Sequence, residues 1–271
     1  MTLRSLLFVP GDRPERFAKA AATGADAIIL DLEDSVVAER KIYAREAVKA
    51  YLVERASTVF VRVNPLDSRF IDDDLAALAD ARPDGVVLPK AEGAADVARL
   101  AVRLPLPILP VATETPAAIF RLGSYADVGS DLAGLTWGAE DLPAAIGATT
   151  SREADGGYTD PYRLVRGLTL FAAHAAGVAA IETVYPDFRD LDGLAAYAAR
   201  GRRDGFTGMM AIHPTQVAVI NAAFTPSDEE LAHARAVVDL FAANPGAGAL
   251  QVDGKMVDAP HLKAARRLLR I

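Results

Sequence analysis

The chain has 271 residues, of which 51% are hydrophobic, so it can bury a large core in one big α/β domain or in two ordinary ones. A formal net charge of −7 excludes an electrostatic nucleic-acid binder, and the absence of cysteine excludes disulfides, thiolate metal sites and cysteine nucleophiles. No apolar run approaches the roughly 18 residues that cross a membrane. The apolar run in the start MTLRSLLFVPGDRPER is too short for a signal peptide. We therefore expect a soluble, cytoplasmic protein without nucleic-acid or membrane partners.

Short apolar runs alternate with longer Ala- and Arg-rich stretches along most of the chain, which is typical of a parallel sheet with crossover helices. The runs predict strands at residues 3–9, 26–32, 57–63, 84–90, 107–113, 132–138, 178–184 and 206–212. The stretches predict helices at residues 15–22, 39–54, 71–81, 94–104, 116–122, 161–176, 191–203 and 214–224. Because eight strands can close into a cylinder, a (β/α)₈ TIM barrel over residues 1–224 is the leading fold, and a doubly wound open sheet is the alternative.

A C-terminal extension follows at residues 225–271. Its first helix should begin after Ser227, which has Glu230 three residues on, in the pattern of a capping box. The segment ALQVDGKMVD then predicts a hairpin that turns at Asp253-Gly254, and a closing helix starts from Pro260. We expect this helix–hairpin–helix extension to be an arm or lid that packs on the barrel mouth of its own or of a neighbouring subunit.

Polar residues follow every predicted strand, at the end where the active sites of TIM barrels lie. They are Gly11, Asp12, Arg13, Glu33, Asp34, Arg62, Asn64, Lys90, Glu114, Glu140, Asp141, Glu182, Tyr185 and His213. A single polar residue at a strand end needs no functional explanation, because polarity resumes wherever a buried strand stops. A charged group after so many strands favours a site at this face.

Glu114 and Asp141 end adjacent predicted strands, and two carboxylates this close repel each other unless a cation lies between them. Mg²⁺ prefers such hard oxygen ligands and keeps part of its water shell, so the pair predicts a magnesium site. Glu33 and Asp34 could hold the waters of the metal. The alternative for Asp141 is a structural one, the N-cap of the next helical turn.

Arg62 ends the third predicted strand and faces the same mouth, where its guanidinium could bind a carboxylate or a developing oxyanion. Its alternative is an ion pair with Glu33 or Asp34. Lys90 suggests Schiff-base aldolase chemistry, but nearby carboxylates would keep this lysine protonated and argue against that role. His213 is more simply a hydrogen-bonding residue than a catalytic base.

The segment FVPGDRPERFAKA combines a glycine, Gly11, with the basic residues Arg13, Arg16 and Lys19. A glycine turn with basic neighbours can bind a phosphate group. No Walker or dinucleotide fingerprint accompanies it, so the segment alone is a weak indication.

The motifs, taken together, resemble the citrate lyase beta subunit family, which includes citryl-CoA, malyl-CoA and citramalyl-CoA lyases. The matching segments are RSLLFVPGDRPERFAKAAATGADAIILDLEDSV, VRVN, LPKAE, ATETPAAI, WGAEDLPAAIGA, AIHPTQV and FTPSDEEL, in order along nearly the whole chain. The resemblance implies a TIM barrel that uses Mg²⁺ to break or form a carbon–carbon bond in a 3-hydroxyacyl-CoA thioester. It also implies a homo-oligomer, a trimer or hexamer, with other citrate lyase subunits as further candidate partners.

By the same resemblance, Arg62 looks like the family's substrate arginine. Glu114 looks like the carboxylate that touches metal and substrate, and Asp141 looks like the second metal ligand. The basic N-terminal segment would help to bind CoA. In the malyl-CoA lyase branch an aspartate of a C-terminal lid is the acid/base, and the motif GKMVDAP puts Asp258 at that position.

The function predicted from these residues is a retro-Claisen cleavage to acetyl-CoA and an α-keto acid. Two alternatives remain open. One is a metal-dependent aldolase that acts on free pyruvate or oxaloacetate and needs neither CoA nor Asp258. The other is a non-catalytic, CoA-binding regulatory subunit.

Overall fold

The computed structural model describes residues 3–55 and 57–269. Contacts within the chain divide it into two compact units, Met1–Phe224 and Thr225–Ile271. Each unit is described by itself below. Among the described residues, no helix is both long and apolar enough to span a membrane.

The first unit is a parallel barrel, as predicted. Its strands are β1 (Ser5–Pro10), β2 (Ala27–Asp31), β3 (Val59–Arg62), β4 (Gly85–Leu88), β5 (Ile108–Pro110), β6 (Gly134–Thr136), β7 (Ala179–Glu182) and β8 (Gly208–Ala211). The hydrogen-bonded order is β5-β4-β3-β2-β1-β8-β7-β6. All eight predicted strands are present, each shorter than its apolar run, and the open-sheet alternative is wrong.

The barrel is completed between β5 and β6, where the pairing is sparse. Two isolated parallel bridges, Ile108 with Leu132 and Val111 with Thr136, join the two segments. The N–H groups of Ala112 and Ala133 donate to the carbonyls of Thr136 and Ile108, over 2.9 and 2.8 Å. This seam brings the residues after β5 next to those after β6.

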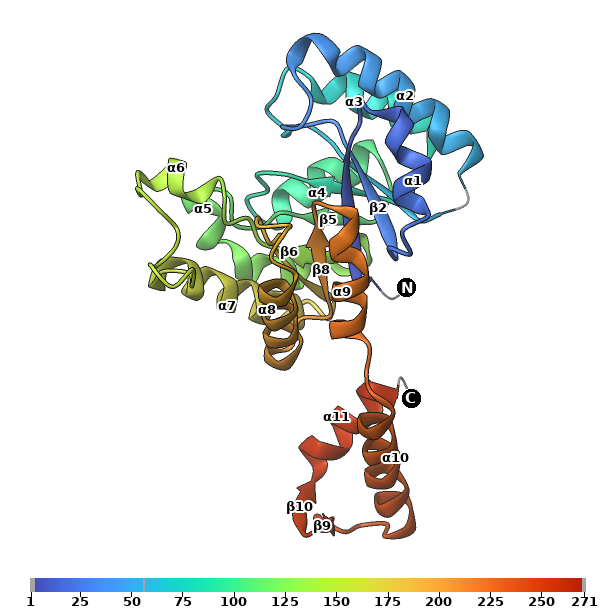
Figure 1. Cartoon of the computed structure of the whole chain (residues 1–271), viewed down its shortest axis with the longest axis vertical. Helices are drawn as coiled ribbons and strands as arrows, with labels where there is room; N and C mark the ends of the chain where they lie inside the picture. Colours follow the sequence, from blue (N-terminus) through green and yellow to red (C-terminus); the bar gives the residue numbers. More distant parts are fainter. Residues whose placement is uncertain (1–2, 56, 270–271) are drawn as a thin grey trace. The chain divides into compact units, whose positions relative to one another are not determined.

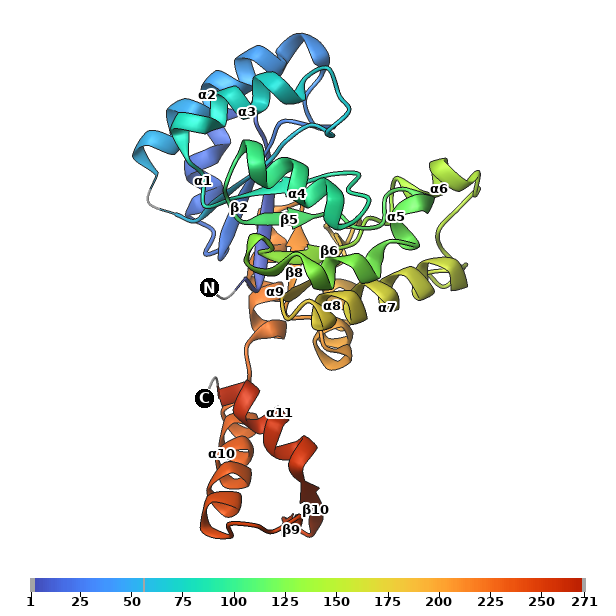
Figure 2. The same cartoon turned by 180° about the vertical axis from the view of Figure 1, so that it is seen from behind.

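Helices surround the strands, and Figure 1 and Figure 2 show them on the outside from opposite sides. They are α1 (Phe17–Ala21), α2 (Lys41–Glu54), α3 (Ile71–Ala81), α4 (Ala94–Arg103), α5 (Pro116–Ile119), α6 (Leu142–Ile146), α7 (Asp160–Ala175), α8 (Leu191–Asp204) and α9 (Pro214–Phe224). The prediction had no α6, because five residues are too few for a helical period to show. The predicted helix 116–122 stops at Ile119, and a 3₁₀ turn continues the segment from Leu122 to Asp127.

Alternation along the strands divides the core into two shells. Leu6, Ile29 and Phe60 pack in the small cluster that fills the barrel interior. Their neighbours Leu7, Ile28 and Val61 pack in the larger cluster between strands and helices. Because side chains of a strand alternate with a period of two, the residues two positions after the interior set also point inward, at the mouth of the barrel.

The second unit consists of α10 (Asp228–Ala243), β9 (Ala249–Val252), β10 (Lys255–Asp258) and α11 (Ala259–Leu269). The predicted capping box is present at the start of α10, where the Ser227 hydroxyl accepts from the Glu230 N–H and the Glu230 carboxylate accepts from the Ser227 N–H. The hairpin turns at Asp253 and Gly254, which have φ values of 49° and 76°. Two successive positive φ angles are typical of a type I′ hairpin turn.

Candidate active site

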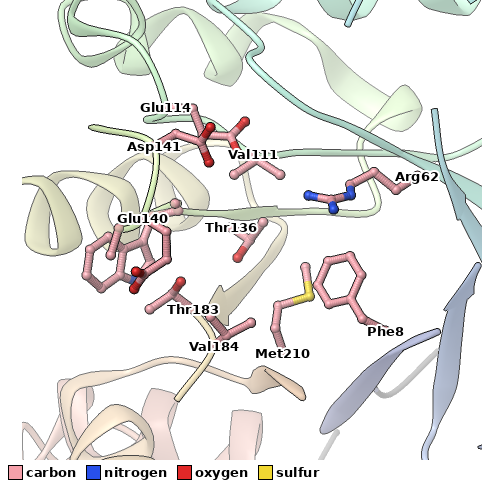
Figure 3. Close-up of a pocket in the computed structure, with 13 residues that line it drawn as sticks. Phe8, Arg62, Val111, Glu114, Thr136, Glu140, Asp141, Thr183, Val184 and Met210 are labelled. Carbon is pink, nitrogen blue, oxygen red and sulfur yellow. The ribbon is translucent and has the colours of Figure 1, made fainter. Parts of the chain in front are cut away.

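A cavity of about 120 Å³ opens at the carboxyl ends of the barrel strands (Figure 3). Three of the residues predicted to carry the chemistry, Arg62, Glu114 and Asp141, line it. The remaining lining residues are Phe8, Val111, Thr136, Trp137, Gly138, Ala139, Glu140, Thr183, Val184 and Met210. The structure thus brings together residues from both sides of the seam between β5 and β6 and from β3.

Arg62 is held in place by Asp31, which lies at the end of the adjacent strand. The Arg62 Nε and Nη2 atoms donate to the two carboxylate oxygens of Asp31, each over 2.7 Å. The ring of Phe8 lies against the guanidinium, 4.9 Å from its carbon to the ring centroid. Burial alone would raise the pKa of Asp31, but the hydrogen bonds and charge of Arg62 outweigh it and hold that pKa below its ordinary value. This bidentate pair fixes the guanidinium and leaves part of it for other partners.

Glu33 is buried between two cations. Its Oε1 lies 2.6 Å from Lys90 Nζ, and its Oε2 lies 3.0 Å from Arg62 Nη1. Burial raises the pKa of Glu33 despite both cations. Asp34, by contrast, is exposed, and its carboxylate lies 3.8 Å from Lys90 Nζ. Glu33 therefore contributes to the charge network that holds Arg62, while Asp34 lies at its edge.

Glu114 is buried to 5% exposure and has few polar partners. Its Oε2 accepts a 2.5 Å hydrogen bond from the backbone N–H of Lys90. Burial raises its pKa to about 8, with smaller contributions from the negative charges of Glu33 and Asp141, and the Lys90 N–H opposes the rise only in part. A nearby cation would therefore stabilise the ionised form of Glu114.

Asp141 occupies the N-cap position of α6, but its side chain makes no capping hydrogen bond. Its Oδ1 lies 3.6 Å from Lys90 Nζ. The structural alternative for this residue is therefore wrong for the side chain, which faces the cavity near Glu114 (Figure 3).

The donor set fits Mg²⁺. Glu114 and Asp141 offer two hard oxygen donors on one cavity, and water and substrate would complete the coordination of an ion that dehydrates reluctantly. Within residues 3–55 and 57–269, no group of three or more His, Cys, Asp or Glu side chains is arranged to bind a metal by itself.

Lys90 has a left-handed backbone, with φ of 52°. Among the described residues, two other non-glycine residues share a positive φ, and both have a local reason: Arg82 is the C-cap of α3 and Asp253 lies in the hairpin turn. At Lys90 the conformation directs the N–H at Glu114 while the side chain reaches Glu33. Its pKa is raised, because the hydrogen bond and charge of Glu33 outweigh burial, so this lysine is held as a cation and not as a Schiff-base nucleophile.

In the basic N-terminal segment, Gly11 has a structural role that the sequence did not indicate. The N–H of Gly11 donates to the carbonyl of Asp31 over 2.7 Å, and a Cβ at this position would meet that oxygen at 2.5 Å. Glycine is therefore required here by contact with β2. Arg13, Arg16 and Lys19 are exposed and lie near the start of α1.

His213 stacks on Phe188 with 4.7 Å between the ring centroids, and its Nδ1 lies 2.8 Å from the Thr215 hydroxyl.

The sequence analysis missed Asp31 as a site residue, and it noted Glu182 only as a polar residue at a strand end. Asp31 was read as part of a buried strand, although its position two residues after Ile29 points it into the mouth. Glu182, fully buried, accepts hydrogen bonds from Trp137 Nε1 and from the N–H of Thr183, over 2.5 and 3.0 Å, and so fixes two walls of the cavity. Arg166 Nε, 2.6 Å from Glu182, balances its charge. The period-two alternation was the available signal for Asp31.

In the second unit, Asp258 ends β10 directly before α11. Its Oδ1 lies 2.6 Å from Nδ1 of His261, and the hydrogen bond from His261 holds its pKa below the ordinary value. His261 is exposed and Asp258 is half-buried.

Comparison with known proteins decides the family. The HpcH/HpaI aldolase/citrate lyase family matches residues 4–214. The chain belongs to this family. A citrate lyase subunit beta-like protein of Mycobacterium tuberculosis is 42% identical over 97% of this chain and 93% of its own length. A (3S)-malyl-CoA thioesterase of Cereibacter sphaeroides is 36% identical over 98% and 93%, and the mitochondrial citramalyl-CoA lyase of Homo sapiens is 31% identical over 99% and 85%.

Solved structures of family members agree with this assignment and with the barrel. The protein CitE of Mycobacterium tuberculosis, in complex with magnesium, acetoacetate and coenzyme A, has a TM-score of 0.86 and 39% identity, covering 99% of this chain and 97% of its own. A citrate lyase beta subunit from the same organism, with oxaloacetate and magnesium, has a TM-score of 0.77 and 40% identity, covering 83% and 98%.

Proposed function

We propose that this chain is a Mg²⁺-dependent carbon–carbon lyase that cleaves a 3-hydroxyacyl-CoA thioester to acetyl-CoA and an α-keto acid. The thioester is of the citryl-CoA, malyl-CoA or citramalyl-CoA type. The observation that carries the proposal is the meeting of Glu114, Asp141 and Arg62 on one cavity. The family, the relatives named lyases and the relative solved with magnesium and coenzyme A support it.

Glu114 and Asp141 would hold the metal. When bound, Mg²⁺ supplies a Lewis acid that favours loss of the proton from the substrate hydroxyl. Glu33, buried between Arg62 and Lys90, keeps the guanidinium beside these carboxylates.

Arg62 stabilises the charge that moves during cleavage. As the carbon–carbon bond breaks, its electron pair passes to the thioester, which becomes an enolate, while the alkoxide becomes the keto carbonyl. The guanidinium N–H groups that neither Asp31 nor Glu33 contacts can bind the enolate oxygen.

Asp258 delivers a proton to the enolate carbon and so completes acetyl-CoA. The proton of the substrate hydroxyl passes to solvent, and Asp258 takes up a proton from solvent before it delivers one to the methyl carbon, so the reaction releases no net proton. Asp258 would act at the mouth of its own barrel or of a neighbouring subunit's barrel. The second unit is then the lid of the enzyme.

Further parts of the proposal concern CoA and assembly. Arg13, Arg16 and Lys19, exposed near the start of α1, would bind the phosphates of CoA, and Gly11 would keep the segment against β2. We also propose a cytoplasmic homo-oligomer, a trimer or hexamer, which would let the second unit serve a neighbouring subunit's site. Other citrate lyase subunits are further candidate partners.

The test is an assay of citryl-CoA, malyl-CoA and citramalyl-CoA side by side, with Mg²⁺ and with EDTA. We expect at least one thioester to yield acetyl-CoA and its keto acid, and EDTA to stop the reaction. Release of free CoA with the hydroxy acid intact would instead show a thioesterase, the activity for which the Cereibacter sphaeroides relative is named. Unchanged turnover in Glu114→Ala would contradict the proposed site.

A matched pair of variants tests the acid. Asp258→Asn should reduce the exchange of acetyl-CoA methyl hydrogens with deuterated water by at least about 10²-fold, because general acid–base catalysis typically contributes that much. Asp253→Asn, in the turn of the same hairpin, is the control and should leave exchange unchanged.

A further inference from the structure

The cavity at the barrel mouth is poor in cations. Among its described lining residues, Arg62 is the one cationic side chain, whereas Glu114, Glu140 and Asp141 are carboxylates. Phe8, Val111, Trp137, Val184 and Met210 make up most of its remaining wall, and all but Phe8 and Val184 are buried. An anionic group in this cavity would find few partners that are not already occupied.

Arg62 itself is largely neutralised. It donates twice to Asp31 and lies 3.0 Å from Glu33. One part of the guanidinium remains for the substrate, and the proposed reaction already uses it at the enolate oxygen.

Lys90 does not change this balance. Its Nζ lies 2.6 Å from Glu33, 3.6 Å from Asp141 and 3.8 Å from Asp34, so three carboxylates share its charge. The hollow that adjoins the cavity is lined by Phe8, Pro10, Asp31, Ser35, Arg62, Val184 and Ile212. Arg62 is again the one cation among those described residues, and Asp31 adds an anion.

The candidate substrates differ in one substituent on the carbon that carries the hydroxyl. This substituent is hydrogen in malyl-CoA, methyl in citramalyl-CoA and a carboxymethyl group in citryl-CoA. The chelating carboxylate and the thioester arm are common to all three, so the wall of the cavity must discriminate between an uncharged group and a second carboxylate.

We infer that this site selects thioesters whose third substituent is small and uncharged, and rejects those with a second carboxylate there. The inference rests on the proposed function and makes it more specific. An unpaired carboxylate in a half-buried apolar site is strongly unfavourable. A methyl group, by contrast, gains from contact with Val111, Val184 and Met210.

The wild-type protein gives the first test, because it needs no variant to fold. In buffer with Mg²⁺, calorimetry with pyruvate, glyoxylate and oxaloacetate should show oxaloacetate binding at least about 10-fold more weakly than pyruvate. Under the same conditions kcat/KM for citryl-CoA should be at least about 10²-fold below that for the better of malyl-CoA and citramalyl-CoA. Equal or tighter binding of oxaloacetate would overturn the inference, and so would no binding of any keto acid.

A charge introduced at the rim gives the second test. Val184 lines both hollows and is only partly buried, so Val184→Lys can place an ammonium beside the third substituent. This variant should raise the ratio of citryl-CoA to citramalyl-CoA turnover by at least about 10-fold. Val184→Met, similar in length and uncharged, is the control and should leave the ratio within about 3-fold of wild type. An equal change in both variants would show an effect of shape and would overturn the role of charge.

These outcomes separate the inference from the proposed function. Cleavage of all three thioesters at similar rates would support the lyase and overturn the selectivity. Selective binding of pyruvate without cleavage of any thioester would support the selectivity and contradict the lyase.

Discussion

The two sides of the barrel mouth treat their carboxylates in opposite ways. At the ends of β2 and β3, Asp31 receives two hydrogen bonds from Arg62, and its pKa lies below the ordinary value although the residue is buried. After β5 and β6, the one hydrogen bond to the carboxylate of Glu114 among the described residues comes from a backbone N–H, and burial raises its pKa to about 8.

The difference shows what each side is built to do. A buried carboxylate with a bidentate guanidinium is a structural element that fixes Arg62. A buried carboxylate with one neutral donor, beside a second carboxylate, favours the binding of a further cation. The same type of side chain is therefore a support on one side of the mouth and a candidate metal ligand on the other.

The largest effect on stability should follow the loss of the ion pair between Asp31 and Arg62. Asp31→Asn leaves the Arg62 guanidinium half-buried with Glu33 as its remaining carboxylate, so we expect the free energy of unfolding to fall by about 3 kcal/mol. Urea denaturation measures it. Asp34→Asn, an exposed acid near the same lysine, is the control, with an expected change below about 0.5 kcal/mol. If Asp31→Asn lowered the free energy of unfolding as little as Asp34→Asn, Asp31 would not have the structural role that distinguishes its side of the mouth.

The same substitution on the other side should act on function and not on stability. Glu114→Gln should reduce turnover by at least about 10²-fold, the scale on which an active-site electrostatic group acts. The free energy of unfolding should not fall, because the change removes an acid whose ionisation burial opposes. Turnover and urea denaturation, measured on one preparation, distinguish the two sides. Loss of stability comparable to that of Asp31→Asn would contradict the assignment.

Acid pH should weaken the contribution of the Asp31–Arg62 ion pair to the free energy of unfolding. The pKa of Asp31 is lowered in the folded protein, so its ionisation stabilises the fold at pH above the ordinary value of 3.8, and the stabilisation is lost as pH falls through the lower folded value. The difference in unfolding free energy between wild type and Asp31→Asn should therefore be constant near neutral pH and shrink below pH 3.8. Denaturation curves along a pH series measure it, and a difference that grows on acidification would reverse the sign argued here.

The smallest effect is expected at Asp141, because its side chain makes no capping bond. Asp141→Ala should change the free energy of unfolding by less than about 0.5 kcal/mol. Asp190→Ala is the matched control: the Asp190 side chain accepts from the Gly193 N–H at the start of α8, and its loss should lower the free energy of unfolding more than Asp141→Ala does. Equal losses in the two variants would restore the structural explanation of Asp141.

The sequence was sufficient for the strands because the buried runs are short, rich in β-branched residues and separated by helical stretches. It was also sufficient to place Arg62, Glu114 and Asp141 at one face, since strand ends in a barrel share that face. It could not show that Asp31, within the apolar run DAIILDL, would pair with Arg62, because that contact depends on the register between β2 and β3. The left-handed backbone of Lys90 and the helix α6 were equally hidden, because neither leaves a periodic signal.

Crystals grown with Mn²⁺ in place of Mg²⁺ provide the most direct test of the metal site, through the anomalous signal of the ion. An anomalous peak within ligand distance of both the Glu114 and the Asp141 carboxylates would confirm that the side of the mouth after β5 and β6 binds the metal. A peak bound by neither residue, or one that lies between Asp31 and Glu33 instead, would contradict it.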